Sequence, residues 1–180
     1  MVQRLNYFQR IWRRLSFQKS GESLVRHLGV IFGHDCKFVH VNIRTFGAEP
    51  YLIRLGDHVE ISGNVRFLPH DGSVWVFRTA EPNIDIIKPI SVGNNVFIGY
   101  GSIILPGATI GDNCIIGAGS VVAGSIPSSS VAAGVPAKVI RSLDEHYEKV
   151  KPSFLQTKKM NRAAKKDYLL QHFDINETLD

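Results

Sequence analysis

A six-residue repeat runs from Val92 to Pro127 and limits the possible folds of this chain more than any other feature. The first position of each unit is Val or Ile, the second is Gly in four of the six units, and the fifth is mostly small, with Ile126 last. An α-helix cannot keep a period of six on one face, because its own period is 3.6 residues. A short strand followed by a sharp turn can, with three units to a coil and coils stacked roughly 4.8 Å apart. The sequence therefore predicts a parallel β-helix, an all-β solenoid whose branched residues fill the interior.

The repeat divides the chain into three regions. Residues 1–29 carry apolar side chains at helical spacing among arginines, residues 30–141 predict the β-helix, and residues 142–180 lose the period and predict a basic helical tail. The N-terminal helix has two interpretations: it caps the end of the solenoid, or it contacts an anionic membrane surface. The repeat also fails near residues 44–51 and over about 70–89. A strand register that stops and later resumes predicts an extruded loop at the second break.

Charge is distributed unevenly along the chain. Of the 21 Lys and Arg residues, 15 lie in residues 1–26 and 138–166, whereas residues 27–137 carry six cations and eight acids. A nucleic-acid groove along the β-helix is therefore not expected. No apolar run approaches the length of a membrane span. The two cysteines give no disulfide framework, and Cys114 occupies a small, inward repeat position, so we expect a core role for Cys114 and a reduced, cytoplasmic setting.

The second break in the repeat begins with a candidate catalytic residue. His70 lies at the mouth of the predicted loop, followed by Asp71 and a Gly turn. Histidine is the side chain best suited to move a proton near neutral pH. A surface histidine is more often without function, so this residue alone leaves both interpretations open.

A longer stretch carries a family resemblance. The run ISVGNNVFIGYGSIILPGATIGDNCIIGAGSVV, followed by VAAGVPAKVIR, resembles the hexapeptide-repeat acyltransferases that use acetyl-coenzyme A. Within this family it is similar to galactoside and maltose O-acetyltransferases, polysaccharide O-acetyltransferases and streptogramin-type xenobiotic acetyltransferases, and the run HDGS is similar to the catalytic-histidine loop of the last two. The resemblance covers about residues 30–141. It implies a left-handed β-helix, a homotrimer with active sites between neighbouring prisms, and acetyl-coenzyme A as co-substrate, with no tightly bound cofactor.

The resemblance also implies roles for individual residues. His70 matches the general base, which takes a proton from the acceptor as it attacks the thioester, and either Asp71 or Glu49 orients it. No acyl-enzyme is expected. The acceptor contacts would be Asn42, Trp75 and Arg78. The implied contacts to coenzyme A are Phe97, Gly99, Tyr100, Ala118, Gly119 and Ala123, with Lys138 and Arg141 on its phosphates.

Other functions fit the same fold. A γ-carbonic-anhydrase-like protein needs three converging histidines, and although His40 and His58 are one coil apart, an irregular segment lies between them, so no metal site is predicted. A non-enzymatic scaffold would not need the HDGS loop or the terminal basic pair. Among acceptors we favour a saccharide hydroxyl of a cell-envelope or exopolysaccharide unit. The amine of a nucleotide-linked sugar and a xenobiotic remain alternatives.

Overall fold

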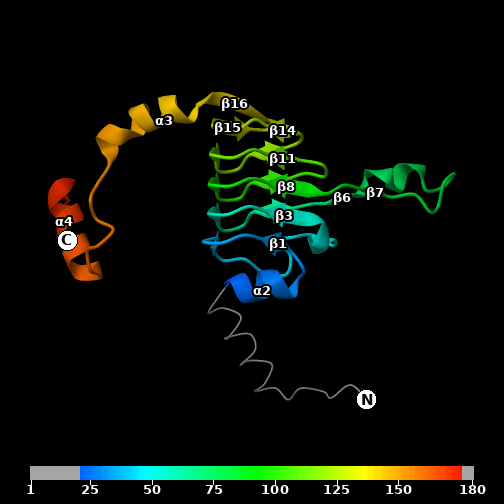
Figure 1. The fold of residues 1–180 in the computed structure, drawn as a ribbon, viewed down its shortest axis with the longest axis horizontal. Coiled ribbons are helices and arrows are strands. Elements are labelled where there is room, and N and C mark those ends of the chain that lie inside the picture. Colours follow the sequence, from blue (N-terminus) through cyan, green and yellow to red (C-terminus); the bar gives the residue numbers. More distant parts are fainter. Residues whose placement is uncertain (1–20, 176–180) are drawn as a thin grey trace, which may run out of the picture. The chain divides into compact units, whose positions relative to one another are not determined.

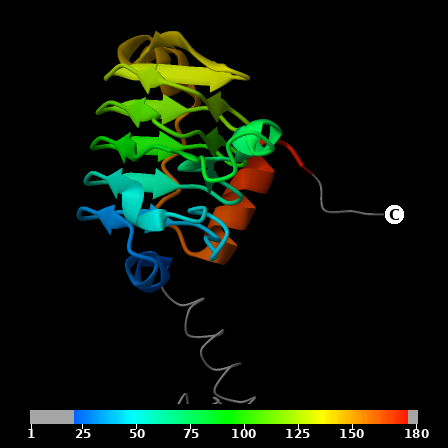
Figure 2. The same cartoon turned by 90° about the vertical axis from the view of Figure 1, so that its right-hand side faces the viewer.

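The computed structural model describes residues 21–175, and its main body is a stack of coils (Figure 1). The chain divides into two units, residues 1–146 and residues 147–180. In the first unit, successive coils contribute short strands to three mostly parallel sheets, here called the first, second and third faces. The predicted parallel β-helix is therefore confirmed (Figure 2).

The strands of the three faces recur in order along the chain, and the third face has no strand in the first and last coils. The first face consists of β1 (Ile31–Phe32), β3 (Ile53–Leu55), β8 (Ile90–Val92), β11 (Thr109–Ile110) and β14 (Ser125–Ile126). The second consists of β2 (Lys37–Phe38), β4 (Val59–Ile61), β9 (Val96–Ile98), β12 (Cys114–Ile116) and β15 (Ser130–Gly134), to which β16 (Ala137–Ser142) adds antiparallel. The third consists of β5 (Arg66–Phe67), β10 (Ile103–Ile104) and β13 (Val121–Val122).

Branched side chains stack in the interior in the register that the repeat predicts. Ile61, Ile98 and Ile116 lie in one row of the second face, and all three are fully buried. Cys114 is also buried, as its repeat position predicts, and burial raises the pKa of its thiol. Glycine is required where coils meet most closely, because a Cβ on Gly99 would lie 2.6 Å from the backbone nitrogen of Ala118. The repeat thus encodes both the core and the tight stacking.

Polar side chains stack along the corner between the first and second faces. The backbone N–H groups of His34, Asp57, Asn94 and Asp112 each donate to a side-chain oxygen of the next coil. The residues that these bonds join are 23, 37, 18 and 16 positions apart, from the first coil to the last. An undisturbed coil has 18 residues, so the two longer separations contain the two predicted breaks. The last coil is two residues short and places Ile126 beside Ile110, so its assignment to a fifth repeat position is wrong.

The largest insertion leaves the prism as an arm, residues 70–89, between β5 and β8 (Figure 1). Its base is the antiparallel pair β6 (His70–Asp71) and β7 (Ile86–Ile87), and η2 (Gly72–Phe77) follows β6. The smaller insertion contains η1 (Pro50–Leu52), directly before β3. Both insertions lie at the corner between the third and first faces, so they meet there.

Helices flank the solenoid in sequence. α2 (Gly21–His27) buries Leu24 and Val25, and Val25 belongs to the solenoid core. The longer N-terminal helix predicted as a cap or a membrane contact lies mostly in residues 1–20, outside the described part of the chain. α3 (Leu143–Val150) follows β16, and the second unit contains η3 (Lys151–Ser153) and α4 (Arg162–His172). Among residues 21–175, no helix combines the length and apolar character needed to cross a membrane.

Candidate active site

His70 stands where the arm leaves the prism. It begins β6, and its backbone is paired with Ile87 of β7. Lys88, which directly follows β7, donates its backbone N–H to the Pro69 carbonyl at 2.9 Å. These bonds fix the backbone on both sides of His70, and its side chain remains 32% exposed. A fixed but accessible imidazole can meet a ligand without rearrangement of the main chain.

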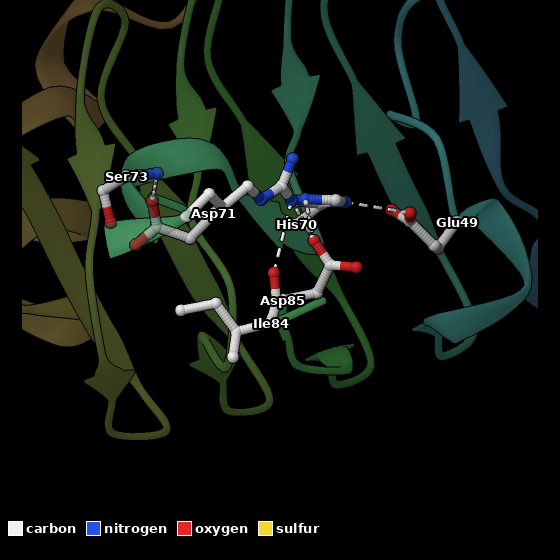
Figure 3. Close-up of polar contacts among 7 residues, drawn as sticks. Glu49, His70, Asp71, Ser73, Ile84 and Asp85 are labelled. Atoms are coloured by element: carbon white, nitrogen blue, oxygen red, sulfur yellow. Dashed lines mark hydrogen bonds and ion pairs between the residues drawn. The ribbon is translucent and has the colours of Figure 1, made fainter. Parts of the chain in front are cut away.

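Glu49 contacts His70 from the smaller insertion (Figure 3). Its Oε1 lies 3.1 Å from His70 Nδ1, and its side chain is only 13% exposed. An ionised carboxylate can only accept hydrogen bonds, so Glu49 favours the tautomer with the proton on Nδ1. The other ring nitrogen, Nε2, then carries the lone pair. This is the state that a general base requires.

Asp71, the other acid considered for this role, points elsewhere (Figure 3). Its Oδ1 accepts a hydrogen bond from the Ser73 backbone N–H at 2.9 Å, and this bond lowers the pKa of Asp71. Asp71 therefore starts the turn of η2, and Glu49 is the acid within hydrogen-bond distance of His70.

A third acid, Asp85, approaches the opposite side of the imidazole ring. Asp85 Oδ1 lies 3.5 Å from His70 Nε2 and also accepts a hydrogen bond from Arg78 Nη2. Arg78 Nη2 further lies 3.3 Å from the Ile84 carbonyl, so its guanidinium binds within the arm. Asp85 is not predictable from the sequence, because nothing in the aperiodic arm indicates which residue returns to the histidine.

Of the remaining acceptor candidates, Asn42 lies just before the smaller insertion and Trp75 lies on the arm. Asn42 accepts the backbone N–H of Arg44 through its side-chain Oδ1, which makes it part of a local turn. Trp75 is 75% exposed on η2, beside the exposed side chains of Val76 and Phe77. The arm thus presents an apolar surface within the described part of the chain.

The residues implied in donor binding, apart from Ala123, fall on other sides of the prism than His70. Phe97 points outward from β9 on the second face and is 40% exposed. Ala123 follows β13, at the corner between the third and first faces. The corner between the second and third faces holds four of the implied residues: Gly99, Tyr100, Ala118 and Gly119.

A β-bulge brings Lys138 and Arg141 to one side of β16. Lys138 pairs with Ala133 and Arg141 with Val131, and the register shifts between these pairs. Because Ala133 and Val131 are two residues apart, their side chains point the same way, and so do those of their partners. Ala132 between them belongs to the solenoid core and its two neighbours do not, so this common direction is outward. Without the bulge, residues 138 and 141 would face opposite sides.

A groove of about 370 Å³ runs along the outer side of the second face. Phe97 and Ile115 contribute apolar surface, and Leu143 lies at one end. Its polar lining consists of Asp35, Lys37, His58, Glu60, Asn95 and Asn113. The groove lies on the same outward side as Arg141, because strand pairing aligns three of its lining residues with Arg141 in one row. The row consists of Glu60, Phe97, Ile115, Val131 and Arg141.

The histidine and this outer row are separated by the body of the prism. His70 lies at the corner between the third and first faces, and in a three-sided prism that corner is opposite the second face. Within one chain, the candidate base and the candidate phosphate ligands Lys138 and Arg141 therefore do not share a cleft. Within residues 21–175, no group of three or more His, Cys, Asp or Glu side chains is arranged to hold a metal ion.

Comparison with known proteins identifies the family. The sequence model described as bacterial transferase hexapeptide (six repeats) matches residues 89–124. Protein CapG of Staphylococcus aureus is 48% identical over 168 residues, which cover 93% of this chain and 98% of that protein. The chain belongs to the hexapeptide-repeat acyltransferases. The predicted family and the predicted enzyme class, an acetyltransferase, are thus confirmed.

Two further hexapeptide-repeat relatives bear on the chemistry of the family. The galactoside O-acetyltransferase of Escherichia coli strain K12 is 39% identical over 127 residues, covering 63% of this chain and 57% of that protein. The crystal structure of a hexapeptide-repeat acetyltransferase from Vibrio cholerae, complexed with acetyl coenzyme A, is 28% identical with a TM-score of 0.52. That match covers 68% of this chain and 75% of the other, and it agrees with the left-handed β-helix that the family resemblance implies.

Proposed function

We propose that this hexapeptide-repeat acyltransferase moves an acetyl group from acetyl-coenzyme A to a hydroxyl of a saccharide, with His70 as general base. The observation that carries the proposal is the His70–Glu49 contact of 3.1 Å, which favours a free Nε2 at the root of the arm. The galactoside O-acetyltransferase and the acetyl-coenzyme A complex among its relatives support the acceptor and the donor. The exposed rings of Trp75, Phe77 and Tyr51 offer flat apolar surfaces suited to sugars.

The proposed reaction is a direct transfer. Nε2 of His70 removes the proton of the acceptor hydroxyl while the hydroxyl oxygen attacks the thioester carbonyl. The C–O bond forms, the C–S bond breaks, and the leaving thiolate takes the proton from the imidazolium. Glu49 holds the ring and stabilises its positive charge. Backbone N–H groups of the glycine-rich corners are the expected donors to the oxyanion.

The donor site in this proposal uses the outward row of the second face and the adjacent corner. Phe97 and Arg141 are separated by three strand spacings, roughly 14 Å, a length that an extended pantetheine arm can span. Phe97 would then lie near the thioester and Lys138 and Arg141 near the phosphates. Gly99, Tyr100, Ala118 and Gly119 would line the channel between them, whereas Ala123 lies at the opposite corner of the same prism.

We also propose that the working enzyme is a homotrimer. His70 and the outward row of the second face lie on opposite sides of one prism, so a complete site needs a neighbouring copy. A closed threefold ring supplies that neighbour to every chain equally. Light scattering is expected to give three times 20.0 kDa. A monomer at micromolar concentration would contradict sites shared between copies. A cytoplasmic location is proposed with it, because acetyl-coenzyme A is available there.

The experiment that tests the function is a screen of acceptors with release of the coenzyme A thiol as readout. Methyl glycosides, nucleotide-linked amino sugars and xenobiotics are compared with wild-type protein and the His70→Ala variant. The expected result is His70-dependent transfer to a glycoside hydroxyl. The product ester should be cleaved by hydroxylamine or dilute alkali, whereas a base-stable product would favour the amide-forming alternative. A relative named as an N-acetyltransferase, 49% identical over 61 residues, makes that control necessary.

A further inference from the structure

Asp85 is held beside the ring nitrogen that the reaction uses. Glu49 occupies the Nδ1 side of His70, so an acceptor hydroxyl must approach Nε2. Asp85 Oδ1 lies 3.5 Å from that nitrogen, and its side chain is 46% exposed (Figure 3). An oxygen that approaches Nε2 from the side of Asp85 therefore lies close to the Asp85 carboxylate as well.

Arg78 gives this carboxylate a fixed position. Arg78 bonds Asp85 Oδ1 and the carbonyl of the preceding residue, Ile84, so two contacts hold this part of the arm. The second carboxylate oxygen, Oδ2, makes no hydrogen bond within the described chain. A fixed carboxylate with a free oxygen, next to the base, is arranged to accept a hydrogen bond from a ligand.

The reacting hydroxyl cannot supply that bond. A hydroxyl has a single hydrogen, and it must point at Nε2 for His70 to remove it. The donor to Asp85 must then be a second group on the acceptor, close to the reacting oxygen. In a sugar, the neighbouring hydroxyl of a vicinal pair stands about one hydrogen-bond length away.

We propose that Asp85 is a specificity-determining residue that accepts a hydrogen bond from the hydroxyl next to the one acetylated. This inference rests on the proposed function and deepens it: the acceptor is a saccharide with a vicinal diol, not an isolated hydroxyl. Arg78 acts through Asp85 as a positioning residue.

The test measures discrimination between paired acceptors. Each methyl glycoside that the wild-type protein acetylates is compared with its monodeoxy analogue, which lacks the hydroxyl beside the acetylated position. The ratio of kcat/KM for the two acceptors is measured for wild type, Asp85→Ala and Asp85→Asn. A hydrogen bond to a charged group predicts a wild-type ratio of about 10- to 100-fold. It predicts a ratio near one for Asp85→Ala and an intermediate ratio for Asp85→Asn, whose carbonyl oxygen still accepts.

Glu81→Ala provides the matched control. Glu81 is an exposed acid of the same arm, with no side-chain contact to His70 in the described chain, and this variant should keep the wild-type ratio. If Asp85→Ala slows both acceptors equally, Asp85 only holds the arm and the inference is wrong. A wild-type ratio near one would also overturn it. Failure to acetylate any glycoside would instead contradict the proposed function, and this inference, which rests on it, would also be wrong.

Discussion

Replacing Glu49 with Gln is expected to lower turnover about 20-fold while the side chain keeps its size. Glu49 Oε1 lies 3.1 Å from His70 Nδ1 in a largely buried position. Two effects follow from the loss of the carboxylate. The imidazolium that forms during proton transfer loses its charged partner, and the tautomer of the neutral ring is no longer determined.

The magnitude follows from these two effects. A hydrogen bond to a charged group contributes about 1.5–3 kcal/mol and a neutral one about 0.5–1.5 kcal/mol, so the lost charge accounts for roughly a tenfold decrease. Glu49 Oε2 is buried without a hydrogen-bond partner among the described residues, so no neighbour fixes which amide atom of Gln faces His70. When the NH₂ group faces Nδ1, the ring proton moves to Nε2 and the base is lost. Because the two orientations are then about equally populated, this supplies a second factor of about two.

The assay is steady-state thiol release with saturating acceptor, with the Michaelis constant for acetyl-coenzyme A measured in parallel. That constant should stay within about twofold, because Glu49 contacts only the base. Asp71→Asn is the matched control: the Asn side chain can still accept the Ser73 N–H, and turnover should stay within about threefold. Wild-type turnover in Glu49→Gln, alongside an inactive His70→Ala, would refute the role assigned to Glu49.

Three further outcomes are expected. His70→Ala should reduce turnover by about 10²–10⁴ and leave coenzyme A affinity, measured by calorimetry, nearly unchanged; near-wild-type turnover would exclude His70 as the base. The double variant Lys138→Ala/Arg141→Ala should have a higher Michaelis constant for acetyl-coenzyme A, with a smaller increase for an acetylated pantetheine that lacks the nucleotide. Equal increases for both donors would show that these residues do not bind phosphates. Gly99→Ala should lower the free energy of unfolding by about 1–3 kcal/mol, because its Cβ would lie 2.6 Å from Ala118 N, whereas Gly124→Ala, with no atom within 4 Å, should be tolerated in thermal unfolding.

The sequence predicts the solenoid well because the fold repeats a local rule. Each unit carries its own branched core residue and its own turn. The spacing of 18 residues between Ile98 and Ile116 therefore predicts directly that these two residues are neighbours in the stack. The wrong repeat position assigned to Ile126 has the same origin. A coil that is two residues short keeps the same pattern of apolar residues, and only the pairing of Ile126 with Ile110 reveals the shift. The site is less predictable, since it depends on contacts between insertions. Glu49 and His70 are 21 residues apart, with no period connecting them.

The placement of His70 also follows from the physics of the solenoid. Inside a regular coil, outward side chains lie on flat sheets, where nothing converges on them from more than one direction. Insertions at the corner between the third and first faces break that flatness, and two of them in adjacent coils bring Glu49, His70 and Asp85 together from three separate segments. The regular coils, in contrast, supply the long straight row from Glu60 to Arg141 that an extended donor requires. We therefore expect acceptor contacts at the irregular corner and donor contacts on the regular face, so substitutions in the arm should change acceptor choice without changing donor affinity.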